Sequence, residues 1–227
     1  VTKVHMLNRN TNKYIDVTVP CKDGTFAQEG DCQIAGVDGT AAELRVNFLN
    51  PSGAKTGSLL PTGAVTDQFE IPELGSVEVT ILDVSNPMVL VRAEDIGAEG
   101  TELPDVVNGN EKMCALLETI RGMAACRMGF AKDLADASQN SPAVPKVGFI
   151  CAPRAYTGIG GEVVRKENMD LCVRVISVFK CHKACPLTSA SAIAVAAALK
   201  GSIVEKMIAE GTNPKQIRIG HPSGVMT

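Results

Sequence analysis

The segment HKACPLTSASAIAVAAALKG (residues 182–201) constrains the fold more than any other part of the chain. Between Ser191 and Lys200 it contains only Ala, Ile, Val and Leu, so a helix formed there has no polar face. A helix that is apolar all round is buried on all sides. We therefore expect a central buried helix from about Thr188 to Leu199, whose first N–H groups are also buried and need partners.

Small hydroxyl side chains gather where this helix starts. Thr188 and Ser189 are of the types that commonly cap a helix N-terminus, and Ser191 lies within the first turn. Free N–H groups and the helix dipole together attract an anion, and hydroxyl groups add donors without adding net charge. The spacing alone also fits ordinary capping of a core helix. Because a buried N-terminus needs partners, we expect Thr188 and Ser189 to hold a carboxylate of a small organic acid.

Three further stretches are candidates for such a site. In GHPSG, a His between Gly and Pro shapes a turn that can approach a ligand closely, so His221 and Ser223 are candidate contacts. In SNP, the proline holds Asn86 in an extended conformation and sets the direction of its amide. Both patterns also fit a plain turn. The loop of residues 53–63 (GAKTGSLLPTG) could cradle an anion, although it lacks the P-loop pattern.

Hydrophobic periodicity predicts several strands and a smaller number of helices along the chain. Alternating or β-branched runs predict strands at residues 1–7, 14–20, 43–49, 76–84, 88–94, 146–153 and 170–181 and at the start of 216–227. Three- and four-residue spacing predicts helices at residues 110–130, capped by Asn108 or Asn110, and at 202–211, closed by Gly211. This order favours an α+β fold in which a curved sheet encloses the helix of residues 188–199.

Charge and hydropathy exclude several classes of protein. Lys plus Arg is 22 and Asp plus Glu is 25, giving a net charge of −3, and no basic stripe indicates nucleic-acid binding. No apolar run reaches the roughly 18 residues of a membrane span. The opening VTKVHMLNRN lacks the apolar core of a signal peptide, so we expect a cytoplasmic protein. A homo-oligomer is compatible with these features.

The eight cysteines favour reduced thiols over metal ligands. They are scattered through the chain without a CxxC motif, as core thiols are. Only three residues that could bind zinc lie close together in the sequence, Cys181, His182 and Cys185, and no second cluster of Cys or His would complete a zinc site. We therefore expect no metal site. Cys185 comes just before the apolar helix, whose dipole would lower a thiol pKa, and it is the one cysteine that we consider as a candidate reactive thiol.

Six segments, taken in order, carry a resemblance to a known family. They are VHMLNRNTNK, GVDGTAAELRVNFLNPSGAKTGSLLPTG, DVSNPMVLV, TELPDVVNGN, HKACPLTSASAIAVAAALKGSIV and RIGHPSGVM. The sequence resembles the PrpF family from Val4 to Met226, and its SNPMV and TSASAIAVAAA stretches are similar to the diaminopimelate epimerase fold. That fold implies two similar domains, each wrapping sheet around a buried helix, with the active site between the two helix starts. Residues 1–72 then form the last part of a first domain and residues 73–227 most of a second.

The resemblance also implies an activity. The family includes isomerases of 2-methylaconitate, aconitate and 3-methylitaconate and a tautomerase of oxalomesaconate, which move a proton and a double bond, or interconvert cis and trans forms, without a cofactor. Their catalytic Lys and Cys belong to an N-terminal region with an NCGN-like motif that this sequence lacks, so we expect a partial chain without the acid/base pair. The epimerase cysteine position falls at Pro186, and catalysis is therefore not carried over to Cys185.

Two other functions are compatible with the residues. A chain without the catalytic pair could be a carboxylate-binding or accessory module. An amino-acid racemase or epimerase would need two opposed thiols. Under the isomerase reading, Thr188 and Ser189 bind a carboxylate of a small unsaturated acid, with Asn86, His221 and Ser223 as weaker contacts.

Overall fold

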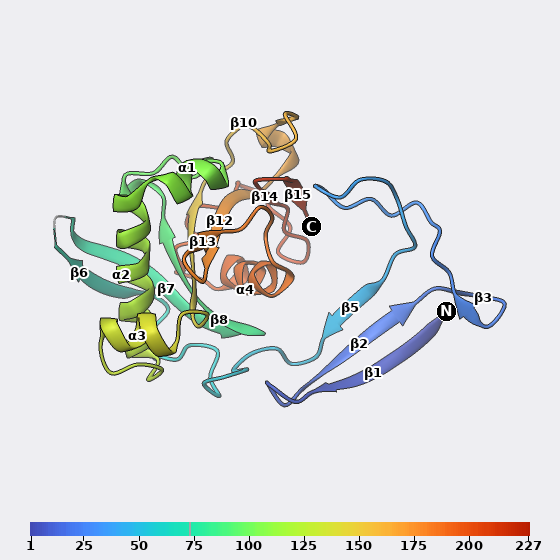
Figure 1. The fold of residues 1–227 in the computed structure, drawn as a ribbon, viewed down its shortest axis with the longest axis horizontal. Coiled ribbons are helices and arrows are strands. Elements are labelled where there is room, and N and C mark those ends of the chain that lie inside the picture. The colour runs from blue at the N-terminus through green and yellow to red at the C-terminus, as the bar shows by residue number, and fades with distance from the viewer. Residues whose placement is uncertain (73) are drawn as a thin grey trace.

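The chain folds as an α+β protein with two unequal parts (Figure 1). The computed structural model describes residues 1–72 and 74–227. The smaller part is a three-stranded antiparallel sheet formed by β1 (Thr2–Asn8), β2 (Lys13–Val19) and β5 (Arg45–Phe48), which projects from the rest of the molecule. Within the described residues, no helix has both the length and the apolar character needed to cross a membrane.

The larger part is built on a mixed, eight-stranded sheet. Its main path runs in the order β15–β14–β12–β9–β8–β7–β6, with β13 paired to β12. The pairs β8–β9 and β12–β14 are parallel, and the other pairs are antiparallel. The strands are β6 (Asp67–Ile71), β7 (Gly75–Val84), β8 (Asn86–Arg92), β9 (Lys146–Cys151), β12 (Leu171–Ser177), β13 (Lys180–Cys181), β14 (Ile219–His221) and β15 (Gly224–Met226).

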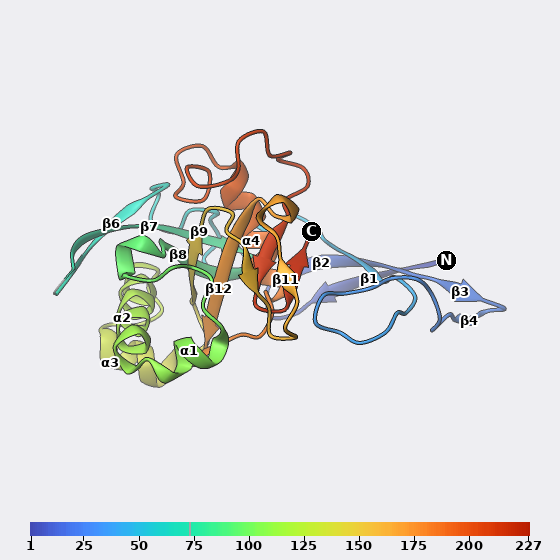
Figure 2. The same ribbon diagram turned by 90° about the horizontal axis from the view of Figure 1, so that it is seen from above.

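Helices cover both faces of this sheet (Figures 1 and 2). One face carries α1 (Pro104–Gly109), α2 (Glu111–Arg127) and α3 (Leu134–Asn140), and the other carries α4 (Leu187–Ala198). Alternation along β7 explains the two cores, since Val79 and Ile81 pack with α2 whereas Leu82 and Val84 pack with α4. The remaining short elements are β3 (Cys21–Lys22), β4 (Thr25–Phe26), β10 (Tyr156–Thr157), β11 (Val163–Val164) and the 3₁₀ helices at Glu94–Ile96 and Lys166–Asn168.

Helix α4 confirms the expected central helix but is not buried on every side. Residues Ala192, Ile193 and Ala196 are fully buried against the sheet. The opposite side, including Leu187 and Ser191, lines a groove of about 570 Å³ next to the segment before β14. Complete burial was therefore a wrong prediction, because the sheet covers α4 from one side. An alanine-rich face exposes little apolar area and can remain in water at small cost.

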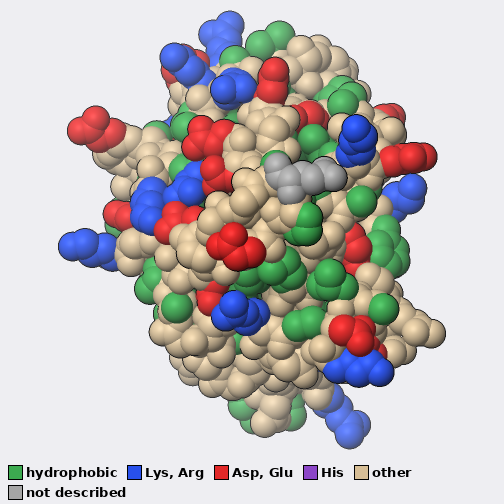
Figure 3. Space-filling model, turned by 90° about the vertical axis from the view of Figure 1, so that its left-hand side faces the viewer, with side chains coloured by type: hydrophobic (Ala, Val, Ile, Leu, Met, Phe, Trp, Pro, Cys, Tyr) green, Lys and Arg blue, Asp and Glu red, His purple; other side chains and the backbone are tan. Residues whose placement is uncertain are grey.

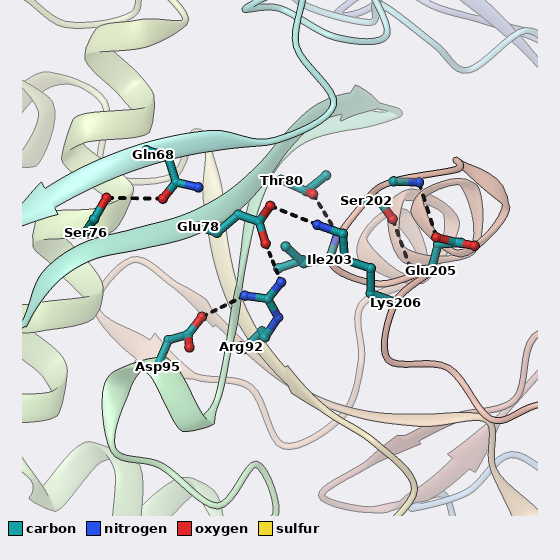
Figure 4. A network of polar contacts seen from close by, with 11 residues as sticks. Gln68, Ser76, Glu78, Thr80, Arg92, Asp95, Ser202, Ile203, Glu205 and Lys206 are labelled. Atoms are coloured by element: carbon teal, nitrogen blue, oxygen red, sulfur yellow. Dashed lines mark hydrogen bonds and ion pairs between the residues drawn. The ribbon is translucent and has the colours of Figure 1, made fainter.

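The expected helix at residues 202–211 is also wrong, since this segment forms turns. Its apolar Ile203 and Val204 are buried, which accounts for the amphipathic spacing. Its polar groups bond to β7 and to α4. The Ile203 N–H donates to Thr80 Oγ1 at 3.1 Å (Figure 4). Ser202 Oγ donates to the Ala196 carbonyl at 2.6 Å. Hydrogen bonds that involve side chains and neighbouring elements thus take the place of the backbone hydrogen bonds of a helix.

Ion pairs fasten the same segment to the sheet (Figure 4). Lys206 Nζ lies 2.9 Å from a Glu78 carboxylate oxygen, and Arg92 pairs with Glu78 and with Asp95. Burial opposes ionisation of Glu78, but its hydrogen bonds to Lys206 and Arg92 outweigh burial and keep its pKa below the usual value. Elsewhere on the face over β6 and α2, acidic and basic side chains are interspersed rather than segregated (Figure 3).

The glycine-rich loop of residues 53–63 does cradle an anion, and that anion is a side chain of the protein. The N–H groups of Lys55 and Thr56 each donate to Asp83 Oδ2 at 2.7 Å, and Thr56 Oγ1 donates to it at 3.0 Å. Gly53 has a left-handed φ of 66°, and a Cβ there would meet the Gly57 backbone at 2.5 Å. Asp83 is fully buried, so this loop is anchored to the end of β7.

The three-stranded sheet has one apolar and one polar face. Register places seven apolar side chains on one face, namely Val4, Met6, Ile15, Val17, Val19, Val46 and Phe48. Val4, Met6 and Val46 are each about 40% exposed, at 39%, 41% and 41%. The other face is polar, and there His5 bonds to Asp16 and stacks on Tyr14. An apolar sheet face of this extent is typical of a surface that another element covers.

We predict that Asp83→Ala lowers the free energy of unfolding by about 3 kcal/mol, because three donors lose a charged acceptor inside the protein. Asp83→Asn retains one acceptor oxygen and should lose less. Urea denaturation followed by circular dichroism measures both, with the exposed Asp31→Ala as the matched control. A loss for Asp83→Ala no larger than that of the control would show that this carboxylate does not anchor the loop.

Candidate functional site

The N-terminus of α4 has no side-chain cap. The N-cap residue is Pro186, in an extended conformation, and Thr188 and Ser189 are the second and third residues of the helix. These hydroxyls therefore do not provide the ordinary helix cap that was the alternative to carboxylate binding, since the helix begins directly after a proline. Ser189 Oγ is buried and has no hydrogen-bond partner among the described residues. The Ser189 hydroxyl is therefore an unsatisfied polar group in the first turn of α4.

Thr188 lies on the wall of a small pocket between the two parts of the molecule. The pocket has a volume of about 40 Å³ and is lined by Asn8, Thr11, Lys13, Ile15, Phe48, Leu49, Pro51, Ser85 and Thr188. It joins the β1–β2 hairpin to the start of α4. Ser85 Oγ is buried and, within the described residues, also has no partner. The size suits one carboxylate group rather than a whole tricarboxylic acid.

The charges around this pocket favour an anion. Lys13 is a cation on the hairpin side, and the positive end of the α4 dipole lies on the other side. The lining residues include no Asp or Glu. Asn8, Thr11 and Ser85 add neutral hydrogen-bonding groups. Sequence reasoning missed Lys13 and Ser85, because only the folded chain brings the hairpin next to α4.

Asn86 is adjacent to the pocket without lining it. It is the first residue of β8, and its Nδ2 donates to the Pro87 carbonyl at 3.5 Å. The residue of this turn that reaches the pocket is Ser85, whose φ of 59° is left-handed. A substrate contact by Asn86 stays a prediction.

His221 and Ser223 belong to a different region. Both are buried in the β14–β15 turn, where His221 Nδ1 accepts from the Ser223 N–H at 3.2 Å and Ser223 Oγ donates to the Lys183 carbonyl. Tyr156 Oη donates to the His221 carbonyl at 2.6 Å. Ser223 lines a cleft of about 710 Å³ with the loop of residues 33–38. The structure thus separates these two residues from the Thr188 pocket, and their contact with substrate stays a prediction.

Cys185 does not have the environment of a reactive thiol. Burial raises its pKa to about 12, which overturns the expected lowering by the helix dipole. Its thiol donates to the Pro186 carbonyl at 3.8 Å. Near it, burial lowers the pKa of the half-buried Lys146, and burial together with Lys146 lowers that of His182. His182 Nε2 is buried and lacks a partner in the described part of the chain.

Comparison with known proteins identifies the family. The family model described as "PrpF protein" matches residues 1–227. The chain belongs to the PrpF family. It is 37% identical to 3-methylitaconate isomerase of Eubacterium barkeri over 227 residues, and 36% identical to 2-methyl-aconitate isomerase of Shewanella oneidensis over 229.

A solved structure shares the fold. The crystal structure of a methylitaconate-delta-isomerase superposes with a TM-score of 0.91 at 37% identity and covers 99% of this chain. This PrpF chain covers 58% of that structure, 60% of the Eubacterium barkeri protein and 57% of the Shewanella oneidensis protein. The relatives are therefore isomerases that are considerably longer than these 227 residues.

We predict that the free energy of unfolding depends on pH through the titration of His221. Burial, and next the charge of Arg174, lower its folded pKa to about 4, whereas an unfolded His titrates near about 6.5. As pH falls from about 6.5 toward 4, the unfolded state binds a proton that the folded state excludes, so the folded state loses stability in this window and not above it.

His221→Asn keeps an acceptor for the Ser223 N–H and removes the titration. Between pH 7 and pH 5 the wild type should lose about 2 kcal/mol more unfolding free energy than His221→Asn. Urea denaturation at the two pH values measures this difference. An identical pH dependence in both proteins would contradict a buried, neutral His221.

Proposed function

We propose that the protein is a cofactor-independent isomerase of an unsaturated di- or tricarboxylic acid, such as 2-methylaconitate, aconitate or methylitaconate. It moves a proton and a double bond, or interconverts cis and trans forms. The observation that carries the proposal is the uncapped start of α4, which opens with Thr188 on a pocket that contains Lys13 and no acid. PrpF relatives named as isomerases of such acids support it.

The chemistry places specific demands on this pocket. A base removes a weakly acidic C–H proton, the resulting negative charge spreads into the double bond and a carboxylate, and an acid returns the proton to another carbon. Donors that are fixed in place before the charge develops stabilise it most effectively. The first N–H groups of α4 with Thr188 and Ser189 are such donors, and Lys13 and Ser85 face them. Asn86, His221 and Ser223 are proposed as weaker contacts.

Catalysis itself requires groups outside these 227 residues. Among the pocket's lining residues, Lys13 is the one titratable group, so the pocket by itself binds a carboxylate without an acid/base pair. By the family resemblance, a Lys and a Cys from additional sequence supply that pair. A racemase would need two opposed thiols, and the raised pKa of the buried Cys185 argues against that alternative.

The domain division follows the same reasoning. We propose that residues 1–72 complete a first domain whose remainder covers the apolar face of β1, β2 and β5, and that residues 73–227 form the second. The greater length of the relatives and the exposed apolar face support this division. The substrate then lies between the two domains, where the α4 pocket already joins them.

The activity is tested with the full-length gene product. Incubated in deuterated water with aconitate, 2-methylaconitate, 3-methylitaconate or oxalomesaconate, it should convert at least one acid and place deuterium on the carbon that receives the proton. Proton NMR follows both events. Absence of conversion and of exchange for all four acids would reject the isomerase assignment.

The binding role of Thr188 is tested separately. Thr188→Val in the full-length enzyme keeps the side-chain shape but removes a donor to a charged group, so kcat/KM should fall about 10- to 100-fold, with a raised KM. Ser191→Ala, at a hydroxyl that lines the separate groove next to the segment before β14, is the matched control and should retain wild-type kinetics. Equal kinetics for both variants would remove Thr188 from the site even if the activity is confirmed.

The domain proposal predicts dye binding. The 227-residue chain should enhance the fluorescence of an apolar dye such as anilinonaphthalene sulfonate more than the longer gene product does, because the face of β1, β2 and β5 is open. Val46→Lys should reduce that enhancement, whereas the adjacent Asn47→Lys, on the polar face, should not. Equal enhancement by the chain, the longer product and both variants would contradict a covered face.

A further inference from the structure

Two buried cysteines face each other across the central sheet. Cys151 ends β9, Cys172 lies near the start of β12, and the two are direct register partners in an antiparallel pair. Their side chains therefore lie on the same face of the sheet, with Cα atoms about 4.5–5.5 Å apart. This spacing falls within the range that a disulfide bridges. Both residues belong to the core that packs against α2.

One of the two thiols borders a pocket. Cys151 lines a pocket of about 200 Å³ together with Glu99, Arg154 and Met207, and its residual exposure is 8%. Its sulfur approaches the backbone at Gly100, where a Cβ would lie 2.4 Å from it. Cys172 lies behind it with no exposure. A small reagent in the pocket would thus meet Cys151 first.

The surroundings favour a thiolate on this pair. The hydrogen bond from Cys151 is the largest influence on both thiols: it lowers the pKa of Cys172 to about 7 despite burial, and it holds the pKa of Cys151 well above the usual value, so the thiolate of the pair is on Cys172. The positive charges of Arg154 and Arg174 act in the same direction on both sulfurs. A shared proton and neighbouring guanidinium groups are typical of cysteines that react with oxidants.

We propose that Cys151 and Cys172 are a site of reversible disulfide formation driven by hydrogen peroxide. The Cys172 thiolate takes the proton of Cys151 as the Cys151 sulfur attacks one peroxide oxygen, the O–O bond breaks, and the products are a Cys151 sulfenic acid and, after protonation of the leaving hydroxide, water. The Cys172 sulfur then attacks the Cys151 sulfur and expels the sulfenic hydroxyl as a second water. Two thiols and one peroxide become one disulfide and two waters, and a dithiol reductant reverses the change.

Another thiol pair provides an internal comparison. Cys114 and Cys181 line a common pocket of about 230 Å³, but they are not register partners. The Cys114 thiol donates to the Val107 carbonyl at 3.2 Å, and the Cys181 thiol to the His182 carbonyl at 3.7 Å. Burial raises the pKa of Cys181 to about 12. Because Cys114 and Cys181 share a pocket but are not paired across neighbouring strands, we expect these two thiols to remain reduced.

The proposed disulfide closes the loop of residues 152–171 at its base. This loop contains β10 and β11, and residues between those strands line the 710 Å³ cleft. Because cross-linking restricts the unfolded chain, oxidation should raise the melting temperature by about 5 °C or more. Neither cysteine lines the Thr188 pocket, so this inference is independent of the proposed function.

Peptide mapping tests the proposal on the 227-residue protein. The chain is treated with hydrogen peroxide, its remaining thiols are alkylated under denaturing conditions, and it is digested with trypsin. Cleavage isolates the two thiols in VGFICAPR (147–154) and ENMDLCVR (167–174), each with a single cysteine. Mass spectrometry should detect these two peptides joined after oxidation, and separate after reduction with dithiothreitol.

Variants and alternative products complete the test. Cys151→Ser should abolish both the joined peptide and the rise in melting temperature, and Cys114→Ser should leave both unchanged. Full alkylation of both thiols in oxidised wild-type protein would overturn the proposal. So would a joined peptide containing Cys114 and Cys181 in place of this pair, or oxidation confined to the Met169 sulfur, which lies 3.1 Å from Cys172 Sγ.

Discussion

Helix α4 begins inside the molecule without a side-chain cap. A helix start held inside a protein normally satisfies its first N–H groups with a side chain, and here a proline occupies the cap. The Oγ atoms of Ser189 and Ser85 lie buried without partners among the described residues. Unpaired polar groups of this kind oppose folding, and their presence at this junction supports the proposed ligand with acceptor oxygens. A carboxylate meets that requirement.

The surrounding elements keep this helix end at the junction of the two parts of the molecule. The sheet buries Ile193 and its neighbours and thereby fixes the axis of α4. The buried carboxylate of Asp83 anchors the loop of residues 53–57 to the end of β7, and two residues later Ser85 turns toward the pocket. The hairpin that carries Lys13 reaches the pocket from the other side. The pocket thus depends on contacts between segments that are remote in sequence.

Local patterns predicted the elements, and tertiary contacts account for the differences. Alternation located β7, and the alanine-rich run located α4, because both signals reside within a few consecutive residues. The turns at residues 202–211 were not predicted, because the spacing of the buried Ile203 and Val204 also fits an amphipathic helix. The polar groups of this segment bond to α4 and β7, and the sequence gives no sign of those contacts. Thr188 was identified from the helix start. Lys13 could not be identified, because only the docked hairpin brings it near α4.

A crystal structure of the full-length protein with a bound unsaturated tricarboxylic acid tests the central claim most directly. We expect a carboxylate oxygen about 3 Å from the backbone nitrogen of Thr188 or Ser189, with the Ser189 hydroxyl donating to the same group. An acid bound elsewhere in the protein, while the first turn of α4 contacts only water or its own side chains, would contradict it.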